Sequence, residues 1–292
     1  MIQHVFTSPK GVRVDMLRLD VLNSLAPGNK WFKLIPNFLA AESAGATRLL
    51  SFGGAFSNHL HALAAMGKAK GLETIACVRA DKESEITPTL YDAQQWGMTL
   101  HYLSRSDYRR RHDAAFVAEL LDHYPKSYLV PEGGGNALGA IGCRDIVDLI
   151  PGAASEYTAV VLACGTGTTL AGVASKVAAG VEVIGVPVLK AEKFMASDIS
   201  NLLSELGGDP GNWRLDNRFH GGAYARLPSY MAEYMQMFEG QYGVLLDPVY
   251  TVKASYAVHH MVEYDEFPAM SRILMIHTGG LQGRRGFGLA LS

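Results

Sequence analysis

Short apolar runs alternate along this chain with stretches in which apolar side chains recur at helical spacing. Runs typical of buried strands occupy 48–54, 74–80, 99–104 and 181–189, and they open the segments 127–136, 159–177 and 272–280. Helical spacing begins near Ser57 and covers 87–97, 113–124 and 137–150. Because strands that alternate with helices form βαβ units, we predict an α/β fold with mostly parallel sheets.

Glycine clusters follow four of the predicted strands, at 53–54, 133–135, 165–167 and 279–280. One cluster alone would indicate a turn. The carboxyl ends of parallel strands meet at one edge of a sheet, and such sheets bind ligands there. Four clusters at strand ends therefore predict a shared crevice.

Composition restricts the class of protein. The 292 residues suit one large or two medium domains, and 48% apolar with 18% charged residues is an ordinary globular composition. A formal net charge of −2 gives no electrostatic footprint for nucleic acid or an anionic membrane. We interpret the basic run 105–112 as a solvated helix start, because Asp107 and Asp113 dilute its charge.

The three cysteines, Cys77, Cys143 and Cys164, form no Cys-x-x-Cys pair. They predict small core residues rather than disulfides or a zinc site. The N-terminus has no apolar signal core, and no uninterrupted apolar run reaches the roughly 18 residues of a membrane span. We expect a cytoplasmic protein.

The segment ACGTGTTLAG, 163–172, is a candidate phosphate loop. Gly165 and Gly167 let the backbone approach a ligand, and the threonines between and after them can add hydroxyl donors. No Gly-Lys-Ser/Thr follows, and Leu170 stands where a dinucleotide fingerprint has its third glycine, which disfavours a nicotinamide-dependent oxidoreductase. The loop indicates either a plain tight turn or a site for a single phosphate group.

A single-phosphate cofactor of metabolic enzymes, pyridoxal 5′-phosphate, needs a lysine for its Schiff base. The segment APGNKWFKL, 26–34, offers Lys30 and Lys33. Most lysines are solvated surface residues. Here Trp31 and Phe32 provide an apolar setting that would lower the lysine pKa and favour an amine nucleophile.

The segment SFGGAFSNHLHALAA, 51–65, places Ser57, Asn58 and His59 at the mouth of a predicted helix. In one interpretation Ser57 or Asn58 only caps the helix and the alanines pack it. In the other, the cap region holds a ligand. The segment alone leaves both interpretations open.

Six segments in chain order resemble a known family, the fold type II pyridoxal-phosphate-dependent enzymes that include 1-aminocyclopropane-1-carboxylate (ACC) deaminase and D-cysteine desulfhydrase. The resemblance spans about residues 17–280 and rests on GNKWFKL, GGAFSNHLHALAA, EGGGNALGAIG, CGTGTTLAG, LDPVYTVKA and HTGG. It implies two three-layer domains with pyridoxal phosphate between them, as in the tryptophan synthase β fold. The large domain would combine 1–40 with 149–292, the small domain would be 41–148, and the molecule would be a homodimer.

The resemblance also implies a role for each matching residue. Lys30 would carry the cofactor, with Lys33 as an auxiliary lysine nearby. Asn58 would bind the phenolic oxygen of the cofactor and, with His59, border the substrate. Ser57 would face the substrate carboxylate and assist proton movement. The remaining implied contacts are with the phosphate (Gly165, Thr166, Gly167, Thr168, Thr169), with the pyridine nitrogen (Thr278), and with the reacting substrate (Tyr250).

Two threonines bear on the substrate. ACC deaminases typically have glutamate where this chain has Thr251 and leucine where it has Thr278, and both threonines resemble the D-cysteine desulfhydrase pattern. A carboxylate would keep the pyridine ring protonated, whereas β-elimination proceeds on a neutral ring because the departing thiolate takes up the developing charge. We therefore expect conversion of D-cysteine, or a related D-amino acid, to pyruvate, ammonia and sulfide. ACC ring opening and an inactive cofactor-binding protein are the alternatives.

Some positions depart from the family pattern. Phe56 stands where the family usually has glutamine, and Trp31 and Phe32 replace a smaller residue and an arginine. The segment 281–292 differs from the usual proline-containing continuation. These changes touch the pocket, so they concern the substrate more than the cofactor.

The other polar candidates receive structural interpretations. Histidines at i and i+1 or i+2 do not share a helix face, so the pairs 59/61 and 259/260 predict no metal site. The long loop 207–228 is a candidate border of the active site. The remaining expectations are hydrogen-bonded structural carboxylates (Asp20, Glu132, Asp247), packing or interface aromatics (Tyr224, Tyr230), and a histidine of either the pocket or the core (His277).

Overall fold

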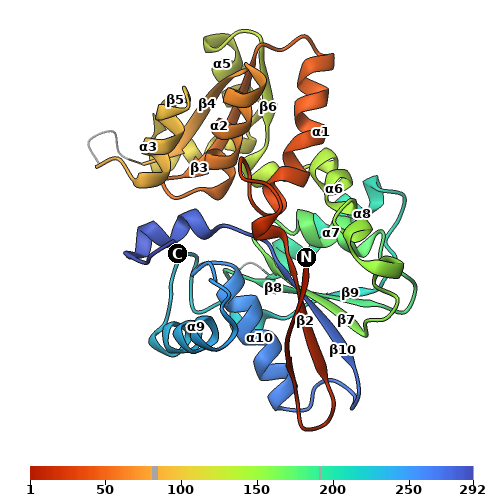
Figure 1. Ribbon diagram of the computed structural model, residues 1–292. Helices are drawn as coiled ribbons and strands as arrows, with labels where there is room; N and C mark the ends of the chain where they lie inside the picture. The colour runs from red at the N-terminus through yellow and green to blue at the C-terminus, as the bar shows by residue number, and fades with distance from the viewer. Residues whose placement is uncertain (81–84, 191, 292) are drawn as a thin grey trace.

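Two sheets, each covered on both faces, make up the computed structural model, which describes residues 1–80, 85–190 and 192–291 (Figure 1). The strands of the smaller sheet lie in the upper lobe of Figure 1 and those of the larger sheet in the lower lobe. Of the strand pairings within these described ranges, only that of β1 with β2 is antiparallel. The predicted α/β class with mostly parallel sheets is confirmed.

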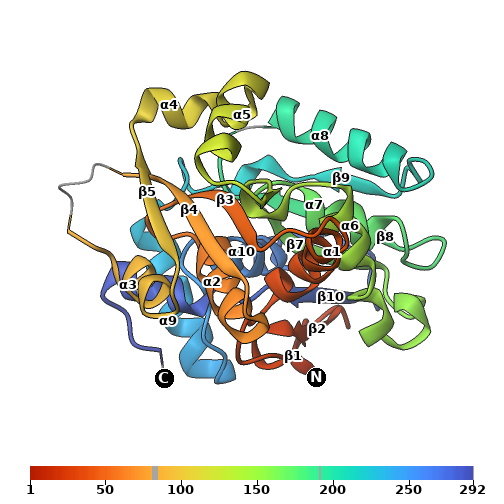
Figure 2. The ribbon, with the colours of Figure 1, turned by 90° about the horizontal axis from the view of Figure 1, so that it is seen from above.

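The smaller sheet has the strand order β5–β4–β3–β6. Its strands are β3 (Arg48–Gly54), β4 (Glu73–Arg79), β5 (Thr99–Leu103) and β6 (Ser127–Val130). Helices α2 (Asn58–Lys70) and α3 (Pro88–Gln95) cover one face, and α4 (Arg105–Arg109) and α5 (Ala114–His123) cover the other (Figure 2). Alternate strand residues face alternate sides, so Leu49 and Leu50 belong to two different cores.

The larger sheet has the strand order β1–β2–β10–β7–β8–β9. Its strands are β1 (Ile2–Thr7), β2 (Arg13–Arg18), β7 (Ala159–Cys164), β8 (Glu182–Pro187), β9 (Trp213–Leu215) and β10 (Arg272–His277). One face carries α9 (Ser229–Tyr242) and α10 (Thr251–Glu263), and the other carries α6 (Ala137–Arg144), α7 (Thr168–Ala174) and α8 (Glu192–Glu205). β7 is buried along its whole length, as an apolar run in the middle of a parallel sheet should be.

Helix α1 (Asn29–Ser43) packs against both parts of the molecule. Leu34 and Phe38 are fully buried in the core beneath the smaller sheet. Near its start, α1 lies against α6 so closely that a Cβ at Gly142 would come within 2.0 Å of the Phe32 carbonyl oxygen. The helix that carries the candidate lysines is therefore fixed from two sides.

The helix predicted for 137–150 is shorter than expected. α6 ends at Arg144, and a 3₁₀ turn follows at Val147–Leu149. Ile146, just before this turn, and Val147, its first residue, are both fully buried, so their apolar pattern reflects burial without a continuous helix. Pro151 disfavours helical backbone at Ile150 and ends the segment.

Two expectations from composition concern burial. All three cysteines are buried and carry free thiols, as predicted for core residues. Among the described residues, no helix combines the length and apolar character that a bilayer crossing needs.

Candidate active site

A cavity of about 820 Å³ lies where the carboxyl ends of strands from both sheets meet. It is bordered by all four predicted glycine clusters, through Gly54, Gly133, Gly165 and Gly279. The sequence-predicted site residues that line it are Lys30, Lys33, Ser57, Asn58, His59, Gly165, Thr166, Gly167, Thr169, Tyr250 and Thr278. The predicted crevice is present, and of the predicted site residues only Thr168 does not line it.

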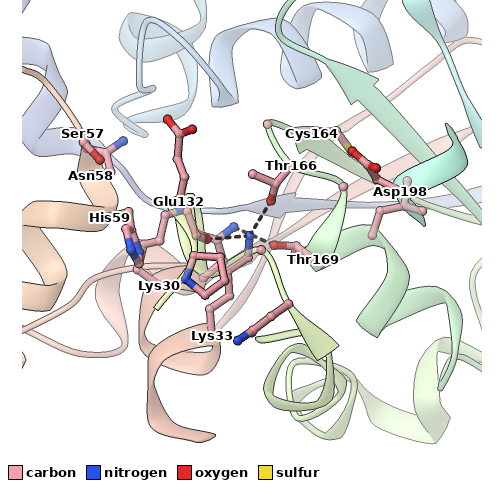
Figure 3. A pocket seen from close by; sticks show the side chains of 18 of the residues that line it. Lys30, Lys33, Ser57, Asn58, His59, Glu132, Cys164, Thr166, Thr169 and Asp198 are labelled. Carbon is pink, nitrogen blue, oxygen red and sulfur yellow. Dashed lines mark hydrogen bonds between the residues drawn. The ribbon is translucent and has the colours of Figure 1, made fainter. Parts of the chain in front are cut away.

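Lys30 reaches the cavity because the start of α1 is held against the end of β10. Asn29 N donates to the Thr278 carbonyl at 3.1 Å. Gly28 has φ of 86°, and a Cβ there would lie 2.1 Å from the Thr278 carbonyl oxygen. Only glycine allows this approach, which delivers Lys30 to the floor of the cavity between the Ser57–His59 segment and the threonines of the glycine loop (Figure 3).

The two lysine amines lie in different surroundings. Lys30 Nζ donates to Asn29 Oδ1 at 3.0 Å. Lys33 Nζ donates to the Gly133 carbonyl and to Thr166 Oγ1, both at 3.3 Å. Burial and then the neighbouring positive charge of Lys33 lower the pKa of Lys30 to about 7, and burial also lowers the pKa of Lys33. Lys30 is thus an amine that is substantially uncharged near neutral pH.

This pKa predicts the pH at which Lys30 becomes reactive. Covalent attachment of pyridoxal phosphate, the cofactor that the sequence resemblance implies, should accelerate about fivefold between pH 6 and pH 7 and level off above pH 8, because only the uncharged amine attacks. The rate of appearance of the visible cofactor band measures it. Lys33→Met removes the repelling charge and should move the midpoint to higher pH; an unchanged midpoint would contradict this account.

The loop between β7 and α7 forms a second wall. Gly167 has φ of 73°, and a Cβ there would lie 2.4 Å from Ile199 Cγ1. Thr166 and Thr169 line the cavity, whereas the Thr168 side chain is fully buried and its hydroxyl lies 2.8 Å from Thr166 Oγ1. The Thr168 hydroxyl therefore supports Thr166, and its implied contact with a phosphate stays a prediction.

The Ser57–His59 segment combines both interpretations that its sequence left open. Ser57 Oγ caps α2 by accepting from Leu60 N at 3.2 Å, and the same residue lines the cavity. His59 is 2% exposed and lies 2.8 Å from Ser51 Oγ through Nε2, while its Nδ1 has no partner among the described residues. Burial and the charges of Lys30 and Lys33 hold the pKa of His59 well below its usual value, so its ring is neutral.

Tyr250 and Tyr224 form a pair of hydroxyl groups 3.2 Å apart on the cavity wall. Burial raises the pKa of Tyr250, so it keeps its proton at neutral pH. The interpretation of Tyr224 as only a packing or interface residue is wrong, because the loop 207–228 carries it into the site. Tyr230 does pack, with its ring centroid 5.4 Å from that of Tyr256.

A buried lysine fixes the loop that carries Tyr224. Lys253 is fully buried, and its Nζ donates to the carbonyls of Val188, His220 and Ala223 at 2.9, 2.8 and 3.2 Å. Burial lowers the pKa of Lys253 to about 8. Sequence reasoning missed this residue, since a lysine in an amphipathic helix resembles a surface residue.

The two diagnostic threonines take different positions. Thr278 lines the cavity, whereas Thr251 is buried away from it and its Oγ1 accepts from Asp247 N at 2.6 Å. Asp247 Oδ1 accepts from the backbone of Val249 and Tyr250, but Oδ2 has no partner among the described residues. Burial raises the pKa of Asp247 to about 7. The expectation that Asp247 is a hydrogen-bonded structural carboxylate therefore holds for Oδ1 but not for Oδ2.

Asp20 and His277 form a structural pair in the core. Asp20 accepts from Arg18 at 2.9 and 2.7 Å and lies 3.3 Å from His277 Nδ1. The other ring nitrogen of His277 is 2.9 Å from the Leu245 carbonyl oxygen. His277 is 1% exposed and belongs to the core rather than the pocket.

The mouth of the cavity contains charges that the sequence analysis did not assign to the site. Glu132 accepts from Tyr108 Oη at 2.7 Å and pairs with Arg111 at 2.8 Å. Glu132, Arg111 and His112 all line the cavity. The basic run 105–112 is therefore not only a solvated helix start, because a 3₁₀ turn at Arg110–His112 directs its end to the site. Figure 3 shows Glu132 above the two lysines.

The arrangement fits the cofactor that the sequence resemblance implies. A glycine loop without room for side chains, two amines with lowered pKa values and an uncharged imidazole edge meet the needs of a phosphorylated aldehyde that binds a lysine. No cluster of three or more metal-ligating side chains occurs among the described residues.

The fold and this site define a pyridoxal-phosphate-dependent enzyme. The sequence confirms the class, since residues 16–279 match the family model described as "Pyridoxal-phosphate dependent enzyme", and the chain belongs to that family. The resemblance noted in the sequence is confirmed.

Relatives narrow the comparison to one branch of the family. The chain is 28% identical over 297 residues to a "Putative 1-aminocyclopropane-1-carboxylate deaminase" of Pyrococcus horikoshii, and the aligned region covers 95% of this chain and 87% of the relative. It is also 28% identical over 289 residues to the "D-cysteine desulfhydrase" of Yersinia pestis, and the aligned region covers 92% of this chain and 87% of that relative. A crystal structure titled as an ACC deaminase homologue superposes with a TM-score of 0.87 at 26% identity, covering 99% of this chain and 91% of that one.

Proposed function

We propose that this enzyme is a lyase that eliminates the β-substituent of a small D-amino acid, with D-cysteine as its simplest substrate. The C–S bond breaks with its electron pair on sulfur, and water converts the remaining enamine to pyruvate and ammonia. The observation that carries the proposal is Thr278 on the cavity wall, with Thr251 turned away toward Asp247. Neither hydroxyl can hold the pyridine nitrogen protonated as a carboxylate would.

Bound pyridoxal phosphate would supply the electron sink that stabilises negative charge at the substrate α-carbon. In our proposal Lys30 holds the cofactor, Gly165, Gly167 and Thr166 surround its phosphate, and Asn58 donates to its phenolic oxygen. Thr278 would face the pyridine nitrogen.

The chain's own groups can perform the proton transfers. With a pKa of about 7, the Lys30 amine can both accept the α-proton and release it at neutral pH. The Tyr250 hydroxyl keeps its proton and can donate it to the departing sulfur, while the Tyr224 hydroxyl, 3.2 Å away, can replenish it. Ser57 would hold the substrate carboxylate.

An assay of the purified holoenzyme with D-cysteine, L-cysteine and ACC tests this proposal. We expect sulfide and pyruvate in equal amounts from D-cysteine, and little 2-oxobutanoate from ACC. Faster turnover of ACC would overturn the substrate assignment in favour of ring opening. Bound cofactor without any substrate-induced spectral change would support the inactive cofactor-binding alternative. Gel filtration tests the expected homodimer.

The dual position of Ser57 gives a further prediction. Ser57→Ala should raise the KM for D-cysteine at least about tenfold, since a hydrogen bond to a charged group contributes about 1.5–3 kcal/mol. It should also cost about 1 kcal/mol of folding stability by removing the cap of α2. Steady-state kinetics and thermal unfolding measure the two effects.

Asp113→Ala is the matched control. Asp113 caps α5 by accepting from Ala115 N at 2.9 Å and does not line the cavity. It should lose similar stability and keep its KM. An equal change of KM in both variants would show that Ser57 acts only through helix stability.

A further inference from the structure

The segment after Gly280, which departs from the family pattern, contacts a cavity-lining residue, Asn58, through Gln282. It forms a 3₁₀ helix, η7 (Leu281–Phe287), at the end of β10. Gly280 has φ of 91°, and a Cβ there would lie 2.6 Å from Asn58 Nδ2. Glycine at this point lets the Asn58 amide lie directly against the start of η7.

The Gln282 amide connects Asn58 to two donors. Its Nε2 donates to Asn58 Oδ1. Its Oε1 accepts from Thr89 Oγ1 at 2.8 Å and from Arg285 Nη2 at 3.4 Å. A guanidinium can only donate, so the oxygen of the Gln282 amide must face Arg285 and its NH₂ group must face Asn58.

Asp92, in helix α3 beside the smaller sheet, holds Arg285 in place. Arg285 Nη2 donates to Asp92 Oδ2 at 2.5 Å, and His61 Nε2 lies 3.0 Å from the same oxygen. Burial acts against ionisation of Asp92, but the hydrogen bonds from Arg285 and His61 outweigh it and lower the pKa of this carboxyl. Asp92 is therefore an anion at neutral pH, and Arg285 has a fixed acceptor.

We propose that Gln282 is a positioning residue that determines which end of the Asn58 amide faces the cofactor. Gln282 occupies the carbonyl oxygen of Asn58, which leaves the NH₂ group to point into the cavity as a donor. Gln282 itself does not line the cavity. The inference rests on the proposed contact between Asn58 and the phenolic oxygen of pyridoxal phosphate.

The orientation has a measurable consequence. A donor at the phenolic oxygen favours the ionised form of that oxygen. Without Gln282, the Asn58 amide is free to rotate and present its own oxygen instead. The proton that the phenolic oxygen shares with the lysine-bound nitrogen is then held more tightly, so the visible band of the bound cofactor titrates at higher pH.

The test is a pH titration of the visible band in the purified holoenzyme, without substrate. We expect the midpoint to rise by about one pH unit in Gln282→Leu, since one unit corresponds to roughly the strength of one such hydrogen bond. Asn58→Ala should raise the midpoint similarly, and the double variant should rise no further than Asn58→Ala. Gln282→Glu keeps the size of the side chain but can only accept from Asn58, so it should raise the midpoint at least as much as Gln282→Leu.

Phe287→Ala, on the same 3₁₀ helix, is the control for disturbance of η7 and should leave the midpoint unchanged. Gln282 variants that titrate like the wild type, or shifts that add fully in the double variant, would overturn the proposal. A wild-type protein with no cofactor band would overturn it together with the proposed function. A band that shifts as expected in an enzyme that releases no sulfide from D-cysteine would refute only the substrate.

Discussion

Lys30→Ala is expected to remove covalently held pyridoxal phosphate and to lower kcat/KM with D-cysteine by about a thousandfold or more. Lys30 would supply both the attachment point and the proton acceptor, and Lys33 Nζ is already engaged with Gly133 and Thr166. Absorbance of the holoenzyme and steady-state kinetics measure the two losses. Borohydride reduction followed by peptide mapping identifies the lysine that carries the cofactor in the wild type.

Lys33→Ala is the matched variant, because it removes the other cavity-lining amine of the same helix. It should keep cofactor attached at Lys30 while binding it less tightly. Cofactor mapped to Lys33 in the wild type would contradict the assignment.

Gly28→Ala is expected to destabilise the protein by about 3 kcal/mol and to prevent tight cofactor binding. Gly28 has φ of 86° and ψ of −154°, a backbone conformation essentially restricted to glycine that costs another residue about 1–3 kcal/mol, and the added Cβ would lie 2.1 Å from the Thr278 carbonyl oxygen. Separation of α1 from β10 would relieve the clash but would displace Lys30. Thermal unfolding should show a fall in Tm of roughly 5 °C, because a chain of 292 residues has a large unfolding entropy.

Gly45→Ala, just beyond α1, separates the two causes. Gly45 also has a positive φ, 67°, but a Cβ there meets nothing within 4 Å. This variant should lose only about 1 kcal/mol and bind cofactor normally. Equal losses in both variants would show that contact with β10 contributes nothing.

The class of fold could be predicted because most strands are buried apolar runs bounded by glycine. β7, with every residue buried, gives the clearest such signal. The end of α6 could not be predicted, because Ile146 and Val147 are fully buried although the helix has ended and a 3₁₀ turn begins at Val147. Periodicity records which residues are buried and not the hydrogen-bond pattern that buries them.

The candidate site was predictable where its residues lie in ordered motifs, and less so elsewhere. Lys30 and Ser57 follow glycines within two or three residues at strand or helix ends, which is a local signal. Tyr224 lies in a loop without periodicity, and its position depends on Lys253, 29 residues further along, holding the His220 and Ala223 carbonyls. Gln282 acts through Asn58, and only the tertiary structure brings these two residues together.

The contact between Asn29 and Thr278 also affects when, during synthesis of the chain, the enzyme becomes able to bind its cofactor. The two residues are nearly the whole chain apart, and closing so long a loop is among the slower and later events of folding. A ribosome exposes Lys30 early, but that amine has no defined position until β10 has been made and has joined β2 and β7. In our proposal Lys30 captures the cofactor, so covalent capture of pyridoxal phosphate would report the completion of the fold, and a nascent chain that has not reached residue 278 should not capture it.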